Sequence, residues 1–194
     1  MVQKFRFIKI EKIEILKKYG PYFDAKPYFD KLRKRHELAV RLKDDFFDIS
    51  YLICISHIEG LSKIMYPDVY NVAPRFKKVI RNYGGQIDDF NKNYVDRIWA
   101  FYRNNIIHDI PIAEPFFENS SSDDFGIIHQ IYLNDNYILN SSGGIDHKFI
   151  KTNKILEITK NCLDNVEKEL KLTDKHVFVL TGKKQNEIKL IRLH

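Results

Sequence analysis

A long helical pattern between Lys26 and Met65 constrains the fold of this chain more than any other feature of the sequence. Pro27 suits the first turn of a helix, where its missing N–H is not needed. Apolar residues then recur at helical spacing and predict one buried stripe. The pattern is equally compatible with one helix and with two helices broken near Asp44 and Asp45. The stripe comprises Leu32, Leu38, Val40, Leu42, Phe46, Ile49, Leu52, Ile53 and Ile55.

Periodicity and turn residues predict the remaining elements. We expect a strand at 4–10 that pairs with the C-terminus, a short basic helix at 75–83 ended by Gly84 and Gly85, a hairpin formed by 125–133 and 136–140, an amphipathic helix at 148–170, and a terminal hairpin formed by 176–181 and 188–193. No low-complexity linker separates two folding units. The sequence therefore predicts a single, mainly α domain over residues 1–194, with peripheral β-hairpins.

Charge and cysteine content narrow the possible partners and location. The formal net charge of +6 favours an anionic partner, although 26 acidic residues are mixed in. Cys54 and Cys162 lie in apolar stretches without metal or disulfide spacing, so we expect two buried free thiols. Residues 1–12 lack the hydrophobic run of a secretory signal, and no stretch has membrane-spanning length. We expect a cytoplasmic protein that does not enter a membrane.

One apolar segment, residues 98–109, carries the chemistry that we expect of a functional site. Arg103, Asn104 and His108 interrupt its hydrophobic pattern shortly before Pro111. On a helix, Asn104 and His108 lie about 40° apart, whereas Arg103 and His108 diverge by about 140°, so Arg103 reaches that face only by its length. A cation, an amide and an imidazole can hold a phosphate and move a proton.

The same three residues have a purely structural interpretation. An imidazolium is favoured at the C-terminal end of a helix, so His108 can act as a cap there. Arg103 can form an ion pair with a surface carboxylate. Both interpretations remain open from the residues alone.

The run Arg103-Asn104-Asn105-Ile106-Ile107-His108 resembles the Arg, polar residue, short spacer and His signature of HEPN domains, helical bundles that include many metal-independent endoribonucleases. The preceding order of an amphipathic helix around 51–61 and a basic segment at 75–80 is similar to that of a bacterial HEPN-like group. This resemblance covers residues 27–110, and residues 111–194 add a β-hairpin, a helix and the terminal hairpin. In the toxin branch of the family a Tyr follows the His by two positions, where this chain has Ile110.

The resemblance implies a homodimer in which two motif helices share one cleft. His108 would act as general acid and base, Arg103 would clamp the phosphate, and Asn104 would orient it. Glu59 on the neighbouring helix could hold a guanidinium, with Asn105 also supporting the site.

An RNA interface is expected around this site. Tyr102 could stack on an unpaired base, which suits single-stranded RNA. Lys77, Lys78 and Arg81 could line a phosphate path, although such cations also serve simply as a solvated face. The same two alternatives apply to the charged run 31–36.

Metal chemistry is not expected. Asp88 and Asp89 stand where N-capping acids belong, and no His or Glu at ligand spacing joins them or Asp96. The leading hypothesis from the sequence is therefore a metal-independent endoribonuclease that needs no cofactor and that functions in defence or stress response. A regulatory protein is a candidate partner. The alternatives are a non-catalytic HEPN-like module that binds RNA, a nucleotide or a protein, and a homodimeric scaffold in which Arg103 pairs with Glu59 or Asp109.

Overall fold

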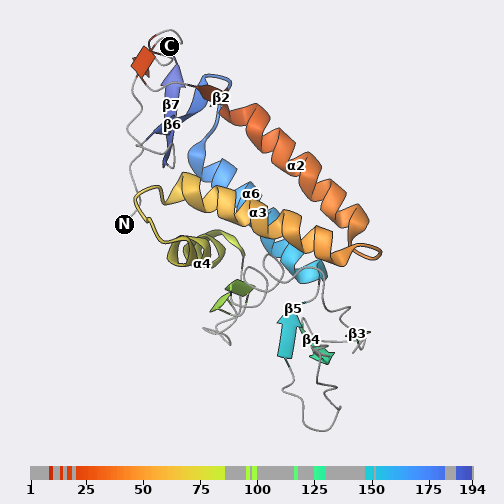
Figure 1. Cartoon of the computed structure of the whole chain (residues 1–194). Helices are drawn as coiled ribbons and strands as arrows, with labels where there is room; N and C mark the ends of the chain where they lie inside the picture. Colours follow the sequence, from red (N-terminus) through yellow and green to blue (C-terminus); the bar gives the residue numbers. More distant parts are fainter. Residues whose placement is uncertain are drawn as a thin grey trace, which may run out of the picture.

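Four long α-helices dominate the part of the chain that the structure describes (Figure 1). They are α2 (Ala25–Leu42), α3 (Phe47–Met65), α4 (Val72–Tyr83) and α6 (Thr152–Leu170). The structure is a computed structural model, and it describes residues 9–10, 14, 17–18, 21–85, 95–96, 98–99, 116–117, 125–129, 147–150, 152–181 and 187–193. The prediction of a mainly helical fold is confirmed, and none of the described helices is long and apolar enough to cross a membrane.

The long helical pattern forms two helices, which is one of the two alternatives that the sequence left open, and the break lies at the expected position for that alternative. α2 ends at Leu42 and α3 begins at Phe47, so Asp44 and Asp45 lie in the connection. Acidic residues are unfavourable at the C-terminal end of a helix and favourable before the next N-terminus, which gives this break a physical cause. The backbone N–H of Phe46 donates to the carbonyl of Leu42 (2.7 Å) and closes the turn.

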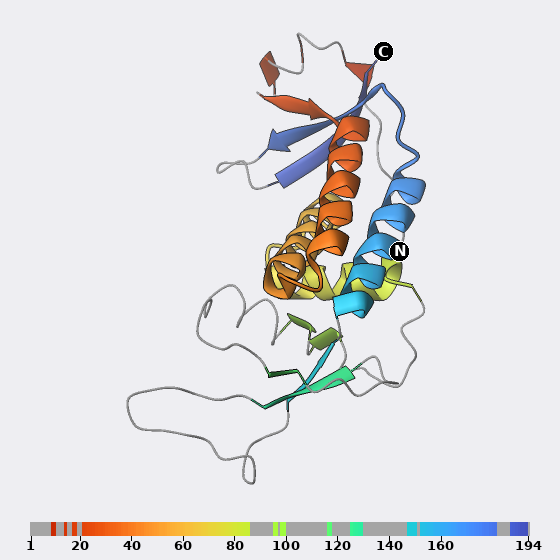
Figure 2. The same ribbon diagram turned by 90° about the vertical axis from the view of Figure 1, so that its right-hand side faces the viewer.

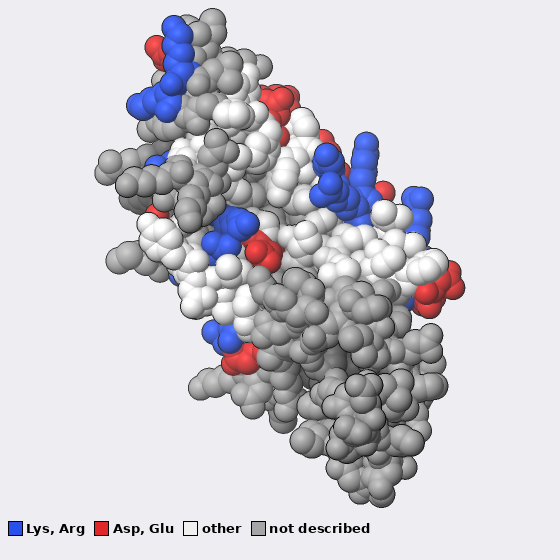
Figure 3. All heavy atoms as spheres, in the orientation of Figure 1, with Lys and Arg blue, Asp and Glu red and all other residues white. Residues whose placement is uncertain are grey.

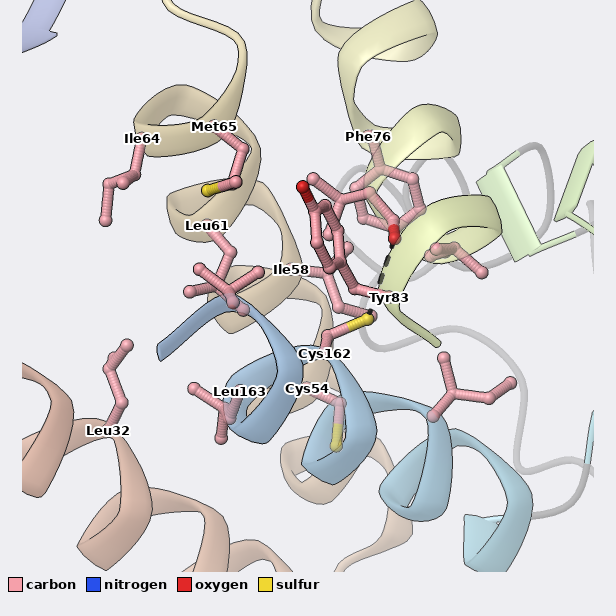
Figure 4. Close-up of a cluster of buried hydrophobic side chains, with 14 of the residues drawn as sticks. Leu32, Cys54, Ile58, Leu61, Ile64, Met65, Phe76, Tyr83, Cys162 and Leu163 are labelled. Atoms are coloured by element: carbon pink, nitrogen blue, oxygen red, sulfur yellow. Dashed lines mark hydrogen bonds between the residues drawn. The ribbon is translucent and has the colours of Figure 1, made fainter. Parts of the chain in front are cut away.

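Helix α3 lies at the centre of the core and packs against α2, α4 and α6. Side chains from all four helices form one buried hydrophobic cluster, part of which is drawn in Figure 4. Its largest fully buried members include Phe29 from α2, Tyr51 and Ile58 from α3, Phe76 from α4 and Ile155 from α6. Helix α6 is thus part of the same core as the helices that precede the motif segment.

Two sheets flank the helices at opposite ends of the molecule (Figures 1 and 2). The first has the order β1-β7-β6-β2 and contains β1 (Lys9–Ile10), β2 (Tyr22–Asp24), β6 (His176–Thr181) and β7 (Glu187–Leu193). Strands β6 and β7 form the predicted terminal hairpin, and β1 joins β7 in parallel, so the N-terminal strand pairs with the C-terminus as expected.

The second sheet is antiparallel and has the order β3-β4-β5. It contains β3 (Phe116–Phe117), β4 (Phe125–His129) and β5 (His147–Ile150). The described partners of β4 are β3 and β5, whereas the strand expected at 136–140 lies outside the described residues. The helix expected from residue 148 was placed too early, because Lys148 to Ile150 belong to β5 and α6 begins at Thr152.

The predicted buried stripe is wrong at four positions. Leu38, Val40, Phe46 and Ile49 are each more than 40 % exposed. The buried face of α2 instead consists of Ala25, Phe29, Leu32, His36 and Ala39. Leu38 lies roughly opposite that face on a helix with about 100° per residue, so its exposure follows from the packing of α2 on one side only.

The C-terminal end of α4 is fixed by side chains of α6. The Nδ2 of Asn165 donates to the carbonyl of Tyr83 (3.0 Å), and the Nδ2 of Asn161 donates to the carbonyl of Gly84 (3.2 Å). These bonds satisfy carbonyls that a helix end leaves without partners. Gly85 has a positive φ of 96°, and a Cβ there would lie 2.7 Å from Asn161 Nδ2, so glycine is required for this close contact. Helix α6 thereby fixes the position of α4.

Candidate functional site

The motif residues lie outside the described part of the chain. This applies to Arg103, Asn104, Asn105 and His108, and also to Tyr102. The structure does describe residues 95–96 and 98–99, which lead into the motif segment. The described part of the candidate site therefore comprises residues 95–96 and 98–99, which lead into the motif, and the helices that pack around them.

The entry to the motif segment docks in the helical core. Val95 is 3 % exposed and Ile98 is fully buried in the main hydrophobic cluster. The ring of Trp99 packs against Phe76 of α4, with ring centroids 5.2 Å apart and an interplanar angle of 60°. This tilted geometry is favourable for an aromatic pair. The chain is thus anchored on α4 four residues before Arg103.

Asp96 binds two of the cations that were predicted to contact RNA. The Nζ of Lys77 lies 2.5 Å from one carboxylate oxygen of Asp96, and the guanidinium of Arg81 lies 3.8 Å from the other. Lys77 and Arg81 are one helical turn apart and share an edge of α4. Their charges therefore hold the entry segment in place and are partly neutralised by it.

Lys78, the third predicted cation, lies on another edge of α4 and contacts an aromatic ring. Its Nζ is 4.3 Å from the ring centroid of Tyr66, within the range of a cation–π interaction. The Nδ2 of Asn82 donates to the Tyr66 hydroxyl oxygen (2.6 Å). Tyr66 follows the end of α3, so Lys78 and Asn82 fix an aromatic ring beside the basic helix.

Arg75 is a cation of this region that sequence reasoning missed. It is 7 % exposed, and its Nε is buried without a hydrogen-bond partner among the described residues. Burial lowers the pKa of the Arg75 guanidinium, and the negative charge of Glu59 partly offsets this effect. A lone Arg in a basic helix is typical of a solvated face, so no sequence signal distinguishes it from its neighbours.

Glu59 lies on α3, half-buried, and its charge acts on Arg75. The sequence analysis expected Glu59 to hold a guanidinium of the motif helix. The cation that the structure brings close to it is instead on α4. Arg103, which Glu59 was also expected to orient, lies outside the described residues. Basic and acidic side chains adjoin over α3 and α4 in the space-filling view (Figure 3).

The charged run at the start of α2 has a structural role at two of its positions. The guanidinium of Arg33 donates to Asp164 (2.5 Å) and to Glu167, both on α6. His36 is buried, and its Nε2 donates to the carbonyl of Leu156 (2.9 Å). These contacts join α2 to α6 and favour the structural interpretation at these two positions.

A second buried histidine lies on α3. His57 is 2 % exposed, and neither ring nitrogen has a hydrogen-bond partner among the described residues. Burial, with the charges of His36 and Arg35, lowers its pKa to about 4. His57 is therefore neutral at physiological pH and does not supply a surface cation.

Both cysteines are buried free thiols, as predicted. Among the residues that the structure describes, no three His, Cys, Asp or Glu side chains form a group that could hold a metal ion.

The described site thus consists of a basic helix with an aromatic neighbour and the anchored entry to a polar motif. Such an arrangement can attract a polyanion. No protein-family model matches this chain, and comparisons with curated proteins and with solved structures find no match.

Proposed function

We propose that this protein is a metal-independent endoribonuclease that cleaves single-stranded RNA, with Arg103, Asn104 and His108 as its active residues. The sequence resemblance to HEPN domains carries the assignment of these roles. The same resemblance leads us to propose a homodimer in which two motif segments share one cleft.

The structural observation that supports this proposal is the docking of residues 95–96 and 98–99 on α4. Trp99 packs on Phe76, and Asp96 binds Lys77 and Arg81. Arg103 follows Trp99 by four residues, so the segment that precedes the motif lies against a helix rich in cations. Lys77 and Arg81 are partly neutralised by Asp96, whereas Lys78 of the same helix is exposed beside Tyr66 and can attract the RNA backbone to a site for phosphodiester chemistry.

The proposed reaction is an internal transesterification. His108 takes the proton from a ribose 2′-hydroxyl, and the 2′-oxygen attacks the adjacent phosphorus. The bond from phosphorus to the 5′-oxygen breaks, and that oxygen leaves with a proton from an imidazolium, which the second protomer's motif would supply. Arg103 stabilises the charge that grows on the phosphorane, and Asn104 orients the phosphate. The products carry a 2′,3′-cyclic phosphate and a 5′-hydroxyl.

A cleavage assay in excess EDTA tests the proposal. A mixed-sequence single-stranded RNA is incubated with the wild-type protein, His108→Ala or the control His129→Ala, whose residue lies on β4. We expect cleavage by the wild type and the control, and a loss of about 10²- to 10⁴-fold in His108→Ala, because a general acid and base is removed.

Two other outcomes would contradict the proposal in distinct ways. Binding that depends on Arg103 without turnover by the wild type would indicate a non-catalytic RNA-binding module. Loss of thermal stability in Arg103→Ala, with neither binding nor cleavage of RNA by the wild type, would indicate that the motif is structural.

A further inference from the structure

One side of α4 combines a buried cation, an exposed cation and a fixed aromatic ring. Arg75, Lys78 and Asn82 follow each other at intervals of three and four residues, so they share a side of the helix. Tyr66 lies against this side through Lys78 and Asn82. We name Arg75, Lys78, Asn82 and Tyr66 the Tyr66 face. It is distinct from the edge where Lys77 and Arg81 bind Asp96.

We propose that the Tyr66 face binds single-stranded RNA, with Arg75 holding a backbone phosphate and the Tyr66 ring stacking on a base. This inference deepens the proposed function, because it names the surface along which the substrate approaches the motif segment. It rests on the proposed RNA substrate and not on the catalytic roles of Arg103 and His108.

The first argument is the state of Arg75. A guanidinium N–H that is taken out of water without a hydrogen-bond partner carries a desolvation penalty. Its Nε has no partner among the described residues, and 7 % of the residue remains exposed. A phosphate oxygen is the acceptor that best offsets this penalty, because guanidinium and phosphate form charge-assisted, often bidentate hydrogen bonds.

The second argument concerns Glu59. Its charge favours the protonated guanidinium of Arg75, yet the two side chains do not form an ion pair within the described structure. Glu59 thus acts on Arg75 through its charge and not as an ion-pair partner. The same carboxylate repels a phosphate, so Glu59 should weaken RNA binding at this position.

The third argument is the fixed ring of Tyr66. Its hydroxyl accepts from Asn82, and one side of the ring lies under the Lys78 ammonium. A half-buried ring held in this way loses little conformational freedom when a base stacks on it. Cations that follow the backbone beside an aromatic platform are the usual features of single-strand binding, since unpaired bases expose their faces.

Fluorescence anisotropy with a labelled, mixed-sequence single-stranded RNA of about 12 nucleotides, roughly one single-strand binding site, tests this inference. All variants are made in the His108→Ala background, so that binding is measured without cleavage. The test variants are Arg75→Met, Lys78→Ala and Tyr66→Ala, and the control is Lys168→Ala, an exposed cation on α6. Glu59→Gln is added as a variant with the opposite expected effect.

We expect Arg75→Met and Tyr66→Ala each to weaken binding by about tenfold, in keeping with the loss of a charged hydrogen bond and of a stacked base. Arg75→Met and Lys78→Ala should each reduce the slope of log Kd against log salt by about 0.7. Glu59→Gln should tighten binding, and Lys168→Ala should leave it unchanged.

The fluorescence of Trp99, the single tryptophan of the chain, shows whether each variant retains the packing next to Phe76. If Arg75→Met does not fold, Arg75→Lys replaces it, because it keeps the charge and loses the bidentate geometry. Wild-type affinity in folded Tyr66→Ala and in the Arg75 variant would overturn the inference, and so would binding to an acidic protein fragment in place of RNA.

The two proposals fail in different ways. If the wild type cleaves RNA and the Tyr66-face variants bind it with unaltered affinity, the nuclease proposal stands and the proposed binding surface is wrong. If RNA binding depends on Arg75 and Tyr66 but the wild type does not cleave RNA, the proposed binding surface stands and the nuclease proposal is wrong.

Discussion

The indole ring of Trp99 packs against the phenyl ring of Phe76, with centroids 5.2 Å apart. Phe76 is fully buried in the core that α3, α4 and α6 share, so this contact ties the entry of the motif segment to the hydrophobic core. Arg103 follows Trp99 by four positions in the sequence. The precision of the proposed active site should therefore depend on an aromatic contact outside it.

Replacement of Trp99 by Ala tests this dependence. Trp99 is half-buried, so we expect a loss of about 2 kcal/mol in the free energy of unfolding, below the range for fully buried aromatic residues. RNA cleavage should fall as well, while Trp99→Phe, which keeps a ring against Phe76, should retain most of both. Urea unfolding followed by circular dichroism gives the stability. Unchanged stability in Trp99→Ala would show that the contact does not anchor the segment.

Local signals in the sequence predicted most of the helices correctly. The break at Asp44 and Asp45, the end of α4 at Gly84 and the hairpin of β6 and β7 each have a local cause, either charge at a helix end or turn chemistry. These causes act within a few residues and do not require knowledge of the tertiary fold. The stripe of α6 is likewise buried as predicted, from Ile155 to Leu170.

The features that the sequence predicted wrongly, or did not predict, depend on tertiary packing. Leu38 is apolar at helical spacing, yet α2 packs on one side and leaves it exposed. Arg75 looks like any cation of a basic helix, yet Glu59 and the core lie beside it. His36 and His57 are buried although both follow polar or charged neighbours. No periodicity rule predicts which of several similar side chains a neighbouring helix will cover.

Removal of Arg33 should loosen the contact between α2 and α6. Its guanidinium donates to Asp164 and Glu167, but all three side chains are partly exposed, so solvent screens the pairs. We expect Arg33→Met to cost about 1 kcal/mol of unfolding free energy. A double-mutant cycle with Asp164→Asn should give a coupling energy of about 0.5 kcal/mol or more that shrinks in high salt. Strictly additive effects would show that the ion pair contributes nothing.

His57 should make the fold sensitive to acid. Its pKa is about 4 in the folded protein, compared with 6.5 for an ordinary histidine. Above pH 6.5 both states are neutral at this ring, whereas between pH 6.5 and 4 the unfolded chain takes up a proton that the folded chain does not. Stability should therefore fall as pH falls through this window, by up to about 3 kcal/mol.

Urea unfolding at several pH values measures this effect, with His57→Leu as the comparison. The variant should lose most of the pH dependence of the unfolding free energy between pH 6.5 and 4. A wild-type stability that is flat across this window would contradict the assignment of a neutral, buried His57 in the folded state.

Cys54 and Cys162 should be unreactive in the native protein. Both thiols are fully buried, and burial raises the pKa of Cys54 to about 12 and raises that of Cys162 as well. Since the thiolate is the reactive form, we expect no labelling by a disulfide reagent at pH 8 without denaturant, and two labelled thiols after unfolding. Rapid labelling of one thiol in the native state would show that the contact between α3 and α6 opens readily.

The chemical nature of the RNA ends tests the proposed function most directly. Wild-type protein and His108→Ala are incubated with single-stranded RNA in excess EDTA, and the new ends are identified by mass spectrometry. The account predicts 2′,3′-cyclic phosphate and 5′-hydroxyl ends from the wild type and almost none from His108→Ala. Products with 3′-hydroxyl and 5′-phosphate ends, cleavage that EDTA abolishes, or equal cleavage by both proteins would contradict it.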